Sequence, residues 1–316
     1  MPGIRQGSIR LGRVAGIDLF LHWSWFVVAV LEIGSRKGRY SSVFWSALEY
    51  LALFAIVLLH EFGHALACRQ VGGTADRIML WPLGGVAYVN PPPRPGATLW
   101  SLAAGPLVNV ALLPILGAAF AMSHSLGWAH TMPDASHLVR AVFFINVALL
   151  IFNILPIYPL DGGQILRSLL WFVLGGARSL MVATVIGFVG AAGLVCLALW
   201  WHSTWSLLIA GYLLLSCWGG LQSARILLRN EKLPRRGGFA CPNCRTAPLL
   251  GERWKCAQCR QAFDTFATGA VCPHCGAQYP NTMCTECQQL RPMSEWAVAG
   301  SYDAGWGAAS TGSLVK

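Results

Sequence analysis

The sequence contains the motif His60-Glu61-Phe62-Gly63-His64 inside a strongly apolar run. On a helix, side chains four residues apart lie on one face, so His60 and His64 can bind one metal ion together. Glu61 lies between them as a candidate general base for a water molecule activated by that metal. The residues from 43 to 66 are otherwise almost all aliphatic or aromatic, and ionisable groups in such a run are costly and usually functional. The motif therefore indicates zinc chemistry inside a lipid bilayer.

A second polar group of residues lies in another apolar region, within the sequence N-I-L-P-I-Y-P-L-D-G-G at positions 153–163. A catalytic zinc ion typically has three protein ligands and one open position, and Asp161 is the candidate for the third ligand. Pro156, Pro159 and the glycine pair interrupt helical regularity, which a membrane tolerates only around protein interior or a water-filled cavity. Such an irregular backbone can bring Asp161 toward the two histidines.

The composition is that of a polytopic membrane protein. Of the 316 residues, 55% are hydrophobic and only 11% are charged, whereas soluble domains carry about 25% charged residues. The lengths of the apolar runs predict six membrane spans, at 17–33, 43–67, 97–122, 138–155, 180–201 and 204–221, with a shorter apolar stretch at 164–174. The first run lacks a cleavage site and reads as a signal anchor. Gly84-Gly85 between apolar segments predicts a β-hairpin over 77–89, in which Pro82 favours an edge position.

The distribution of charge favours a membrane orientation over nucleic-acid binding. The net charge is +10, and the first 238 residues hold 17 Lys and Arg against eight Asp and Glu, whereas the remainder holds six against five. With the amino terminus in the cytoplasm, six spans place most basic residues on the cytoplasmic side, as the positive-inside rule requires. The cluster Arg36, Lys37 and Arg39 is the one violation. We expect both termini in the cytoplasm and no nucleic-acid partner.

Eight of the eleven cysteines form four C-x-x-C pairs after residue 240, namely Cys241/Cys244, Cys256/Cys259, Cys272/Cys275 and Cys284/Cys287. Pairs at such spacing indicate structural zinc, and a reducing cytosol disfavours disulfides. The first two pairs resemble a zinc ribbon and the last two a shorter one. We expect sequential pairing, with one zinc ion for the first two pairs and another for the last two; a cross-braced arrangement stays open as the alternative.

Two motifs in separate spans carry a family resemblance. The combination of H-E-F-G-H with N-I-L-P-I-Y-P-L-D-G-G resembles the site-2 protease family of intramembrane zinc metalloproteases. The segment A-G-P-L-V-N at 104–109 is similar to a family element in the intervening span. His22-Trp23-Ser24 and Leu83-Gly84-Gly85 are similar to features of the compact prokaryotic branch without a PDZ insertion. The resemblance covers about residues 10–225.

The resemblance implies a role for each motif residue. His60, His64 and Asp161 would bind the catalytic zinc ion, and Glu61 would take a proton from water. Asn153 would orient the substrate or its oxyanion and Asn109 would hold the substrate backbone, although helix–helix hydrogen bonding remains open for both. The substrate would be a transmembrane helix of another protein, whose unwound stretch could pair with the hairpin at 77–89. Cleavage would release a cytosolic fragment, as in regulated intramembrane proteolysis.

We therefore predict an α-helical polytopic membrane protein of about six transmembrane helices, with a short β-hairpin near the active site and a small C-terminal double zinc ribbon. The expected parts are a cytoplasmic N-terminal segment (1–16), a membrane-embedded metalloprotease domain (17–225), a basic linker (226–240), tandem zinc-ribbon-like modules (241–290) and a flexible tail (291–316). We expect one catalytic and two structural zinc ions, a prokaryotic inner membrane, and a cytosolic protein partner of the ribbons. Two alternatives stay open: a catalytically silent scaffold that recruits partners through the ribbons, and a zinc transporter.

Overall fold

The computed structural model describes residues 7–35, 38–81, 84–287 and 289–298. The chain divides into two compact units, Met1–Ala224 and Arg225–Lys316, and each is described by itself. Several expectations lie outside the described residues: the Pro82-Leu83 pair of the hairpin turn, the basic residues Arg36 and Lys37, and most of the tail expected over 291–316.

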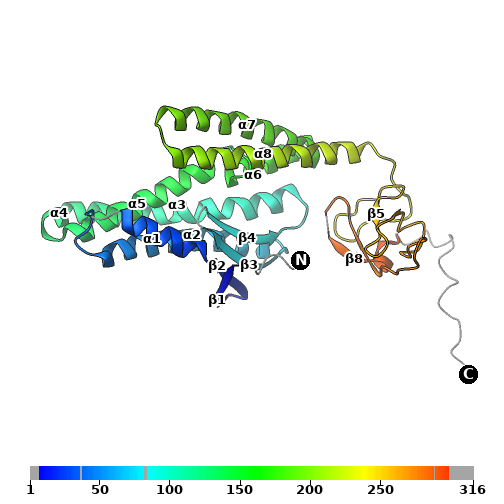
Figure 1. Ribbon diagram of the computed structural model, residues 1–316, viewed down its shortest axis with the longest axis horizontal. Coiled ribbons are helices and arrows are strands. Elements are labelled where there is room, and N and C mark those ends of the chain that lie inside the picture. Colours follow the sequence, from blue (N-terminus) through cyan, green and yellow to red (C-terminus); the bar gives the residue numbers. More distant parts are fainter. Residues whose placement is uncertain (1–6, 36–37, 82–83, 288, 299–316) are drawn as a thin grey trace, which may run out of the picture. The chain divides into compact units, whose positions relative to one another are not determined.

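Five helices of the described chain are long and apolar enough to cross a membrane (Figure 1). They are α2 (Val43–Gln70), α3 (Pro95–Ser125), α5 (Pro133–Ile154), α7 (Gly176–Trp200) and α8 (Thr204–Glu231). Large apolar side chains such as Leu59, Ile115 and Val189 lie exposed on their surfaces, as expected of helices that face lipid. The chain is an integral membrane protein. Two shorter helices, α4 (Trp128–Thr131) and α6 (Asp161–Leu174), lie between them in the chain.

The prediction of a membrane span over 17–33 is wrong. Its first part is strand β2 (Ile17–His22), and only its second part is helical, as α1 (Ser24–Ser35). Along β2 the buried residues Ile17, Leu19 and Leu21 alternate with less buried neighbours, which is the period of a strand with one buried face. The 12 residues of α1 span about 18 Å, well short of a hydrocarbon core of about 30 Å.

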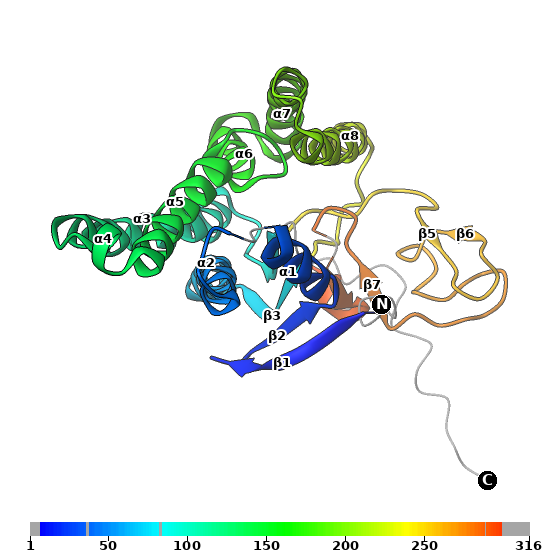
Figure 2. The same ribbon diagram turned by 60° about the vertical axis from the view of Figure 1, so that its left-hand side comes forward.

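A four-stranded sheet packs beside α2, with the strand order β1 (Ser8–Val14), β2, β3 (Thr74–Trp81) and β4 (Gly84–Asn90) (Figure 2). Strands β3 and β4 are antiparallel and form the hairpin predicted over 77–89. β2 runs parallel to β3, from Asp18 opposite Arg77 to Leu21 opposite Leu80. Apolar residues of β2 and β3 form one core cluster with α2, so the sheet is fixed to the helix that carries the H-E-x-x-H motif.

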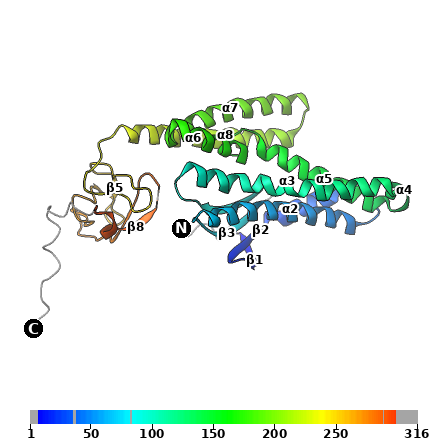
Figure 3. The same ribbon diagram turned by 180° about the vertical axis from the view of Figure 1, so that it is seen from behind.

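Helix α3 lies at the centre of the bundle, in contact with α2, α5 and α6 (Figure 3). The segment that connects α5 to α6 packs against α7 and α8. There Ile157 is 5% exposed and forms a cluster with Ala191 of α7 and Leu213 of α8. The Cys217 thiol of α8 donates to the carbonyl oxygen of Tyr158 at 2.9 Å. These contacts set the position of Asp161 at the start of α6.

The second unit contains short strands and little regular structure. Strands β5 (Trp254–Lys255) and β6 (Ala262–Phe263) pair with each other, as do β7 (Asn281–Met283) and β8 (Leu290–Pro292), and a 3-10 helix covers Met293–Trp296. One core cluster surrounds the buried Phe266 and Trp296, and a second contains Phe263. Each cluster includes cysteines of the C-x-x-C pairs, so the small core is built around them.

Arg69, in the last turn of α2, joins the helix to the sheet. Its guanidinium donates to the carbonyl oxygens of Ala15 at 2.5 Å, Gly16 at 3.0 Å and Ala75 at 2.5 Å. We expect Arg69→Met to lower the free energy of unfolding by about 2 kcal/mol, because charged hydrogen bonds are lost. The exposed Arg13 makes one contact of 3.4 Å with Gly16, so Arg13→Met should cost less than about 0.5 kcal/mol. Denaturation in detergent compares the two, and equal effects would contradict the anchoring role.

Candidate active site

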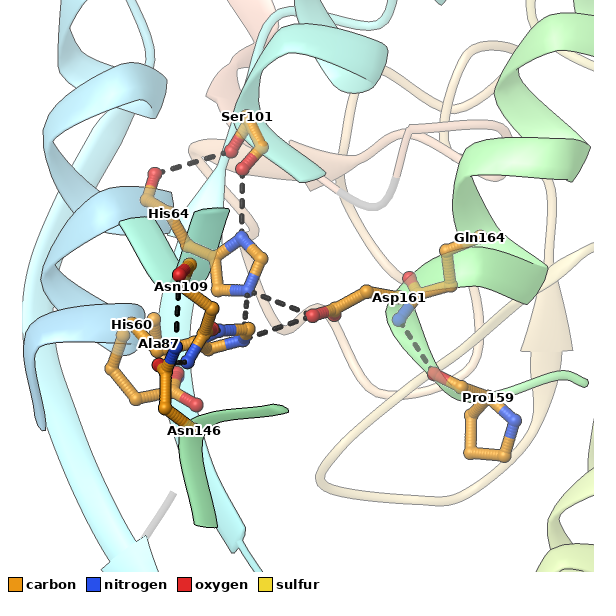
Figure 4. A network of polar contacts seen from close by, with 10 residues as sticks. His60, His64, Ala87, Ser101, Asn109, Asn146, Pro159, Asp161 and Gln164 are labelled. Carbon is orange, nitrogen blue, oxygen red and sulfur yellow. Dashed lines mark hydrogen bonds and ion pairs between the residues drawn. The ribbon is translucent and has the colours of Figure 1, made fainter. Parts of the chain in front are cut away.

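Three ligand atoms from two helices meet in the membrane part of the chain. The Nε2 atoms of His60 and His64 lie 3.1 Å apart, and each lies close to Oδ2 of Asp161, at 3.0 Å and 3.2 Å respectively (Figure 4). The two histidines are separated by one helical turn of α2, and Asp161 is the first residue of α6. Their side chains are largely buried. The arrangement is a compact triangle of donor atoms that faces one common point.

Each imidazole is held from its other nitrogen. Nδ1 of His64 donates to the carbonyl oxygen of Ser101 at 2.8 Å, and Nδ1 of His60 donates to Oδ1 of Asn109 at 2.6 Å. With the proton on Nδ1, the lone pair of each Nε2 is free to bind a metal, which is the usual arrangement of metal-binding histidines. Both partners come from α3, so this helix sets the orientation of both rings.

Two glycines let the surrounding backbone approach these side chains closely. A Cβ atom on Gly105 of α3 would overlap the Nε2 atom of His64 and lie 2.7 Å from that of His60. A Cβ atom on Gly85 of β4 would lie 2.5 Å from Oε1 of Glu61. Any larger residue at either position would displace the site residues.

Glu61 points from α2 toward the sheet rather than toward α3. Its Oε2 atom accepts the backbone N–H of Ala87 in β4 at 2.7 Å, and the residue is 6% exposed. The carboxylate also interacts electrostatically with His60, His64 and Asp161, so it lies near the three ligand atoms. The hairpin thus orients the candidate base.

The donor set fits zinc. A tetrahedral zinc ion with bonds of 2.0–2.1 Å has ligand atoms about 3.3 Å apart, and the three donor–donor distances here are 3.0, 3.1 and 3.2 Å. Two imidazoles with one carboxylate are a common ligand set of catalytic zinc. Three protein ligands also leave a fourth position for a water molecule or a substrate.

Comparison with known proteins assigns these residues to a family. The model of Peptidase family M50 matches residues 49–132 and 116–197. The matched part of the chain, residues 49–197, belongs to this family. The matched residues include the H-E-x-x-H motif and Asp161, whereas the cysteine-rich unit lies outside the match.

Several known proteins are similar to this chain over part of its length. The chain is 32% identical over 182 residues to Zinc metalloprotease MJ0392 of Methanocaldococcus jannaschii, which covers 57% of this chain and 50% of that protein. It is 30% identical over 177 residues to Putative zinc metalloprotease Rip3 of Mycobacterium tuberculosis, with 52% and 44% covered. It is 33% identical over 158 residues to Stage IV sporulation protein FB of Bacillus subtilis, with 48% of each covered. The chain spans about half the length of these curated relatives.

Among solved structures, the chain matches the Site-2 Protease from Methanocaldococcus jannaschii with a TM-score of 0.49 and 26% identity, over 68% of this chain and 95% of that one.

Three asparagines of the membrane helices α3 and α5 differ in their surroundings. Asn153, predicted to contact the substrate, is partly exposed, and its side chain has no hydrogen bond among the described residues. Asn109 is fully buried, and its amide is bound to His60 on one side and Asn146 on the other. This arrangement does not support substrate binding by Asn109. Sequence reasoning missed Asn146, although an amide in the middle of the apolar run 138–155 was a usable signal.

The four cysteine pairs form two sites in a nested order. Cys241 and Cys244 join Cys284 and Cys287, and Cys256 and Cys259 join Cys272 and Cys275. The prediction of sequential pairing is therefore wrong, and so is the cross-braced alternative. The first and fourth pairs meet because Cys241 and Cys284 pack against the common core of Phe266 and Trp296.

The sulfur atoms have the spacing of zinc sites. The Sγ–Sγ distances across the pairs are 3.7 Å for Cys241–Cys287, Cys244–Cys284 and Cys259–Cys272, and 3.5 Å for Cys256–Cys275. All eight cysteines are free thiols. A tetrahedral zinc ion with bonds of about 2.3 Å would place its sulfur ligands about 3.7 Å apart. Both groups therefore fit structural zinc.

The close approach at Gly105 gives a test of the membrane site. We expect Gly105→Ala to weaken zinc binding at His60 and His64 by at least about tenfold, because the added methyl group would displace both rings. Gly117→Ala, in the same helix, is the matched control, since its Cβ atom would meet only Phe143 at an ordinary 3.6 Å. Zinc retention under chelator competition would measure both, and equal retention would contradict the packing argument.

The nested pairing makes a distinct prediction for cysteine protection. In Cys241→Ser, we expect Cys244, Cys284 and Cys287 to become accessible to alkylation, because their zinc site loses a ligand. The inner group of Cys256, Cys259, Cys272 and Cys275 should stay protected. Mass spectrometry of alkylated peptides distinguishes the two groups, and loss of protection at Cys256 and Cys259 instead would favour the sequential pairing.

Proposed function

We propose that this chain is an intramembrane zinc endopeptidase that hydrolyses a peptide bond in or near a transmembrane segment of another membrane protein. One observation carries the proposal: the donor atoms of His60, His64 and Asp161 converge inside an apolar helix bundle, and all three residues interact electrostatically with Glu61. Two of the relatives reported above are named as zinc metalloproteases, which supports it.

In this proposal, His60, His64 and Asp161 hold the zinc ion. When bound, zinc supplies Lewis-acid polarisation of the scissile carbonyl. The Glu61 carboxylate takes a proton from the attacking water and returns it to the leaving amine. The N–H of Ala87 holds this carboxylate in place, and the free amide of Asn153 supplies a hydrogen bond to the substrate or to its oxyanion.

The position of β4 suggests how a substrate reaches these groups. β4 is an edge strand of the sheet, and its residue Ala87 contacts Glu61. A transmembrane helix hides its peptide bonds in internal hydrogen bonds, so the cleaved stretch must first unwind. An unwound stretch that pairs with the β4 edge in the manner of an added strand would pass beside Glu61.

The helix directions support cytoplasmic termini. α2, α5 and α8 run one way, and α3 and α7 run the other way (Figure 3). Strands β1 and β2 lie at the C-terminal end of α2, where Arg69 binds Ala15 and Gly16. Strands β1 and β2 and the C-terminal end of α8 thus lie at the same face of the membrane. This holds although α1 is too short to be a span. We place that face in the cytoplasm of a prokaryotic cell, on the inner membrane, because thiol-based zinc sites need a reducing compartment.

The proposal assigns the protease domain to residues 17–225, with one catalytic zinc ion. Residues 226–240 form the basic linker, and residues 241–290 form a double zinc-binding module with two structural ions. Its two fitting tetrads of thiols support that count. The module offers a surface for a cytosolic protein partner.

A single substitution tests the catalytic assignment. We expect Glu61→Gln to abolish cleavage of single-span test substrates in proteoliposomes, by at least about 100-fold, because the amide cannot take up a proton. Zinc content should equal that of the wild type, since Glu61 is not among the converging ligand atoms. His60→Ala is the comparison variant and should lose both cleavage and one zinc ion. Undiminished function of Glu61→Gln would favour a non-enzymatic scaffold.

A further inference from the structure

A chain of hydrogen bonds runs from His60 through two buried amides to a backbone carbonyl. Nδ1 of His60 donates to Oδ1 of Asn109 at 2.6 Å, and Nδ2 of Asn109 donates to Oδ1 of Asn146 at 2.8 Å. Nδ2 of Asn146 then donates to the backbone carbonyl oxygen of Asn109 at 3.0 Å. Both asparagines are 0% exposed, so solvent cannot replace any of these partners.

The last acceptor determines the direction of the whole chain. A backbone carbonyl oxygen can only accept a hydrogen bond, so Asn146 must turn its NH2 group toward it. Its Oδ1 atom then faces Asn109, which must present its own NH2 group in return. Oδ1 of Asn109 therefore faces His60, and Nδ1 of His60 must carry the proton. Only this tautomer leaves the lone pair of His60 Nε2 free for a metal.

The two histidines differ in the group that accepts the hydrogen bond from Nδ1. His64 is oriented by the backbone carbonyl of Ser101, which is part of the helix and cannot exchange its acceptor for a donor. His60 relies on a side-chain amide, which would present a donor to the ring if it turned by 180°. Asn146 in α5 is the residue that holds this amide in the productive orientation.

We propose that Asn146 is a positioning residue that acts through Asn109 to set the tautomer of His60 and thereby the zinc affinity of the site. This inference rests on the proposed zinc site and adds a residue from α5 that does not contact the ligand atoms. The competing explanation is a helix–helix hydrogen bond that contributes to packing alone.

A double-mutant experiment separates the two roles. In the wild-type background, Asn146→Leu frees the Asn109 amide to turn, and we expect zinc affinity to fall by about 10–100-fold. In an Asn109→Asp background, the carboxylate offers an oxygen to His60 whichever way it turns. There Asn146→Leu should change zinc affinity by no more than about twofold. The full-length chain in nanodiscs, titrated with a zinc chelator, gives both ratios.

Two further variants make the measurement specific to this site. His60→Ala defines the zinc held by the cysteine groups, which is subtracted from every titration. Thr184→Val is the matched control for removing a buried polar group, because Thr184 is 0% exposed and its hydroxyl donates only to the carbonyl of Leu180 within α7. It should keep the zinc affinity of the wild type.

The outcomes are distinct. An unchanged affinity in Asn146→Leu, or an equal loss in both backgrounds, would overturn the positioning role. If the wild type held no more zinc than His60→Ala, the proposed zinc site itself would fail and this inference with it. A large loss that Asn109→Asp suppresses would support the inference, because packing alone gives the same loss in both backgrounds.

Discussion

The structure depends on the need to satisfy polar groups that are buried among apolar helices. Two imidazoles and two carboxylates lie in a bundle whose surface is made for lipid, and each unpaired polar group there would cost several kcal/mol. The bundle provides a partner for every one of them: Ser101 and Asn109 for the rings, Ala87 for Glu61, and the histidines themselves for Asp161. These groups and their partners come from α2, α3, β4 and α6, so the requirement ties together elements that are distant in the chain.

The central position of α3 follows from this requirement. A helix can present backbone oxygen and a side-chain amide to α2 only if the two axes approach closely, and Gly105 removes the Cβ atom that would prevent it. The same helix is joined to α5 by the hydrogen bonds between Asn109 and Asn146. A glycine, an asparagine and a carbonyl of one helix thus determine the geometry of both imidazole rings.

The cysteine-rich unit is also held together by side chains that are distant in the chain. It is too small for a large apolar core, and its two clusters of sulfur atoms take that place. The outer group joins the beginning and the end of the module, while the inner group closes a shorter loop between them. Nesting therefore ties residues 241–287 into one body instead of two independent ribbons.

The sequence by itself determined the chemistry and most of the helices. The spacing of His60 and His64 is local, so one helical face was enough to pair them, and the long apolar runs predicted five spans that the structure contains. Local patterns also predicted the hairpin, and the C-x-x-C spacing predicted the zinc-type cysteine pairs. The alternation Ile17, Leu19, Leu21 was present as well, but the adjoining apolar residues concealed it within a predicted span.

Only the tertiary structure decided how these local pieces meet. The pairing of the cysteine groups depends on the shared core of Phe266 and Trp296, which leaves no trace in the spacing of the pairs. The approach of Asp161 depends on the packing of Ile157 against α7 and α8. The surroundings of Asn109 were decided in the same way, because its side chain lies between His60 and Asn146, which is 37 residues away. Local periodicity specifies which face of an element is polar, but the neighbour of that face is set by packing among all the helices.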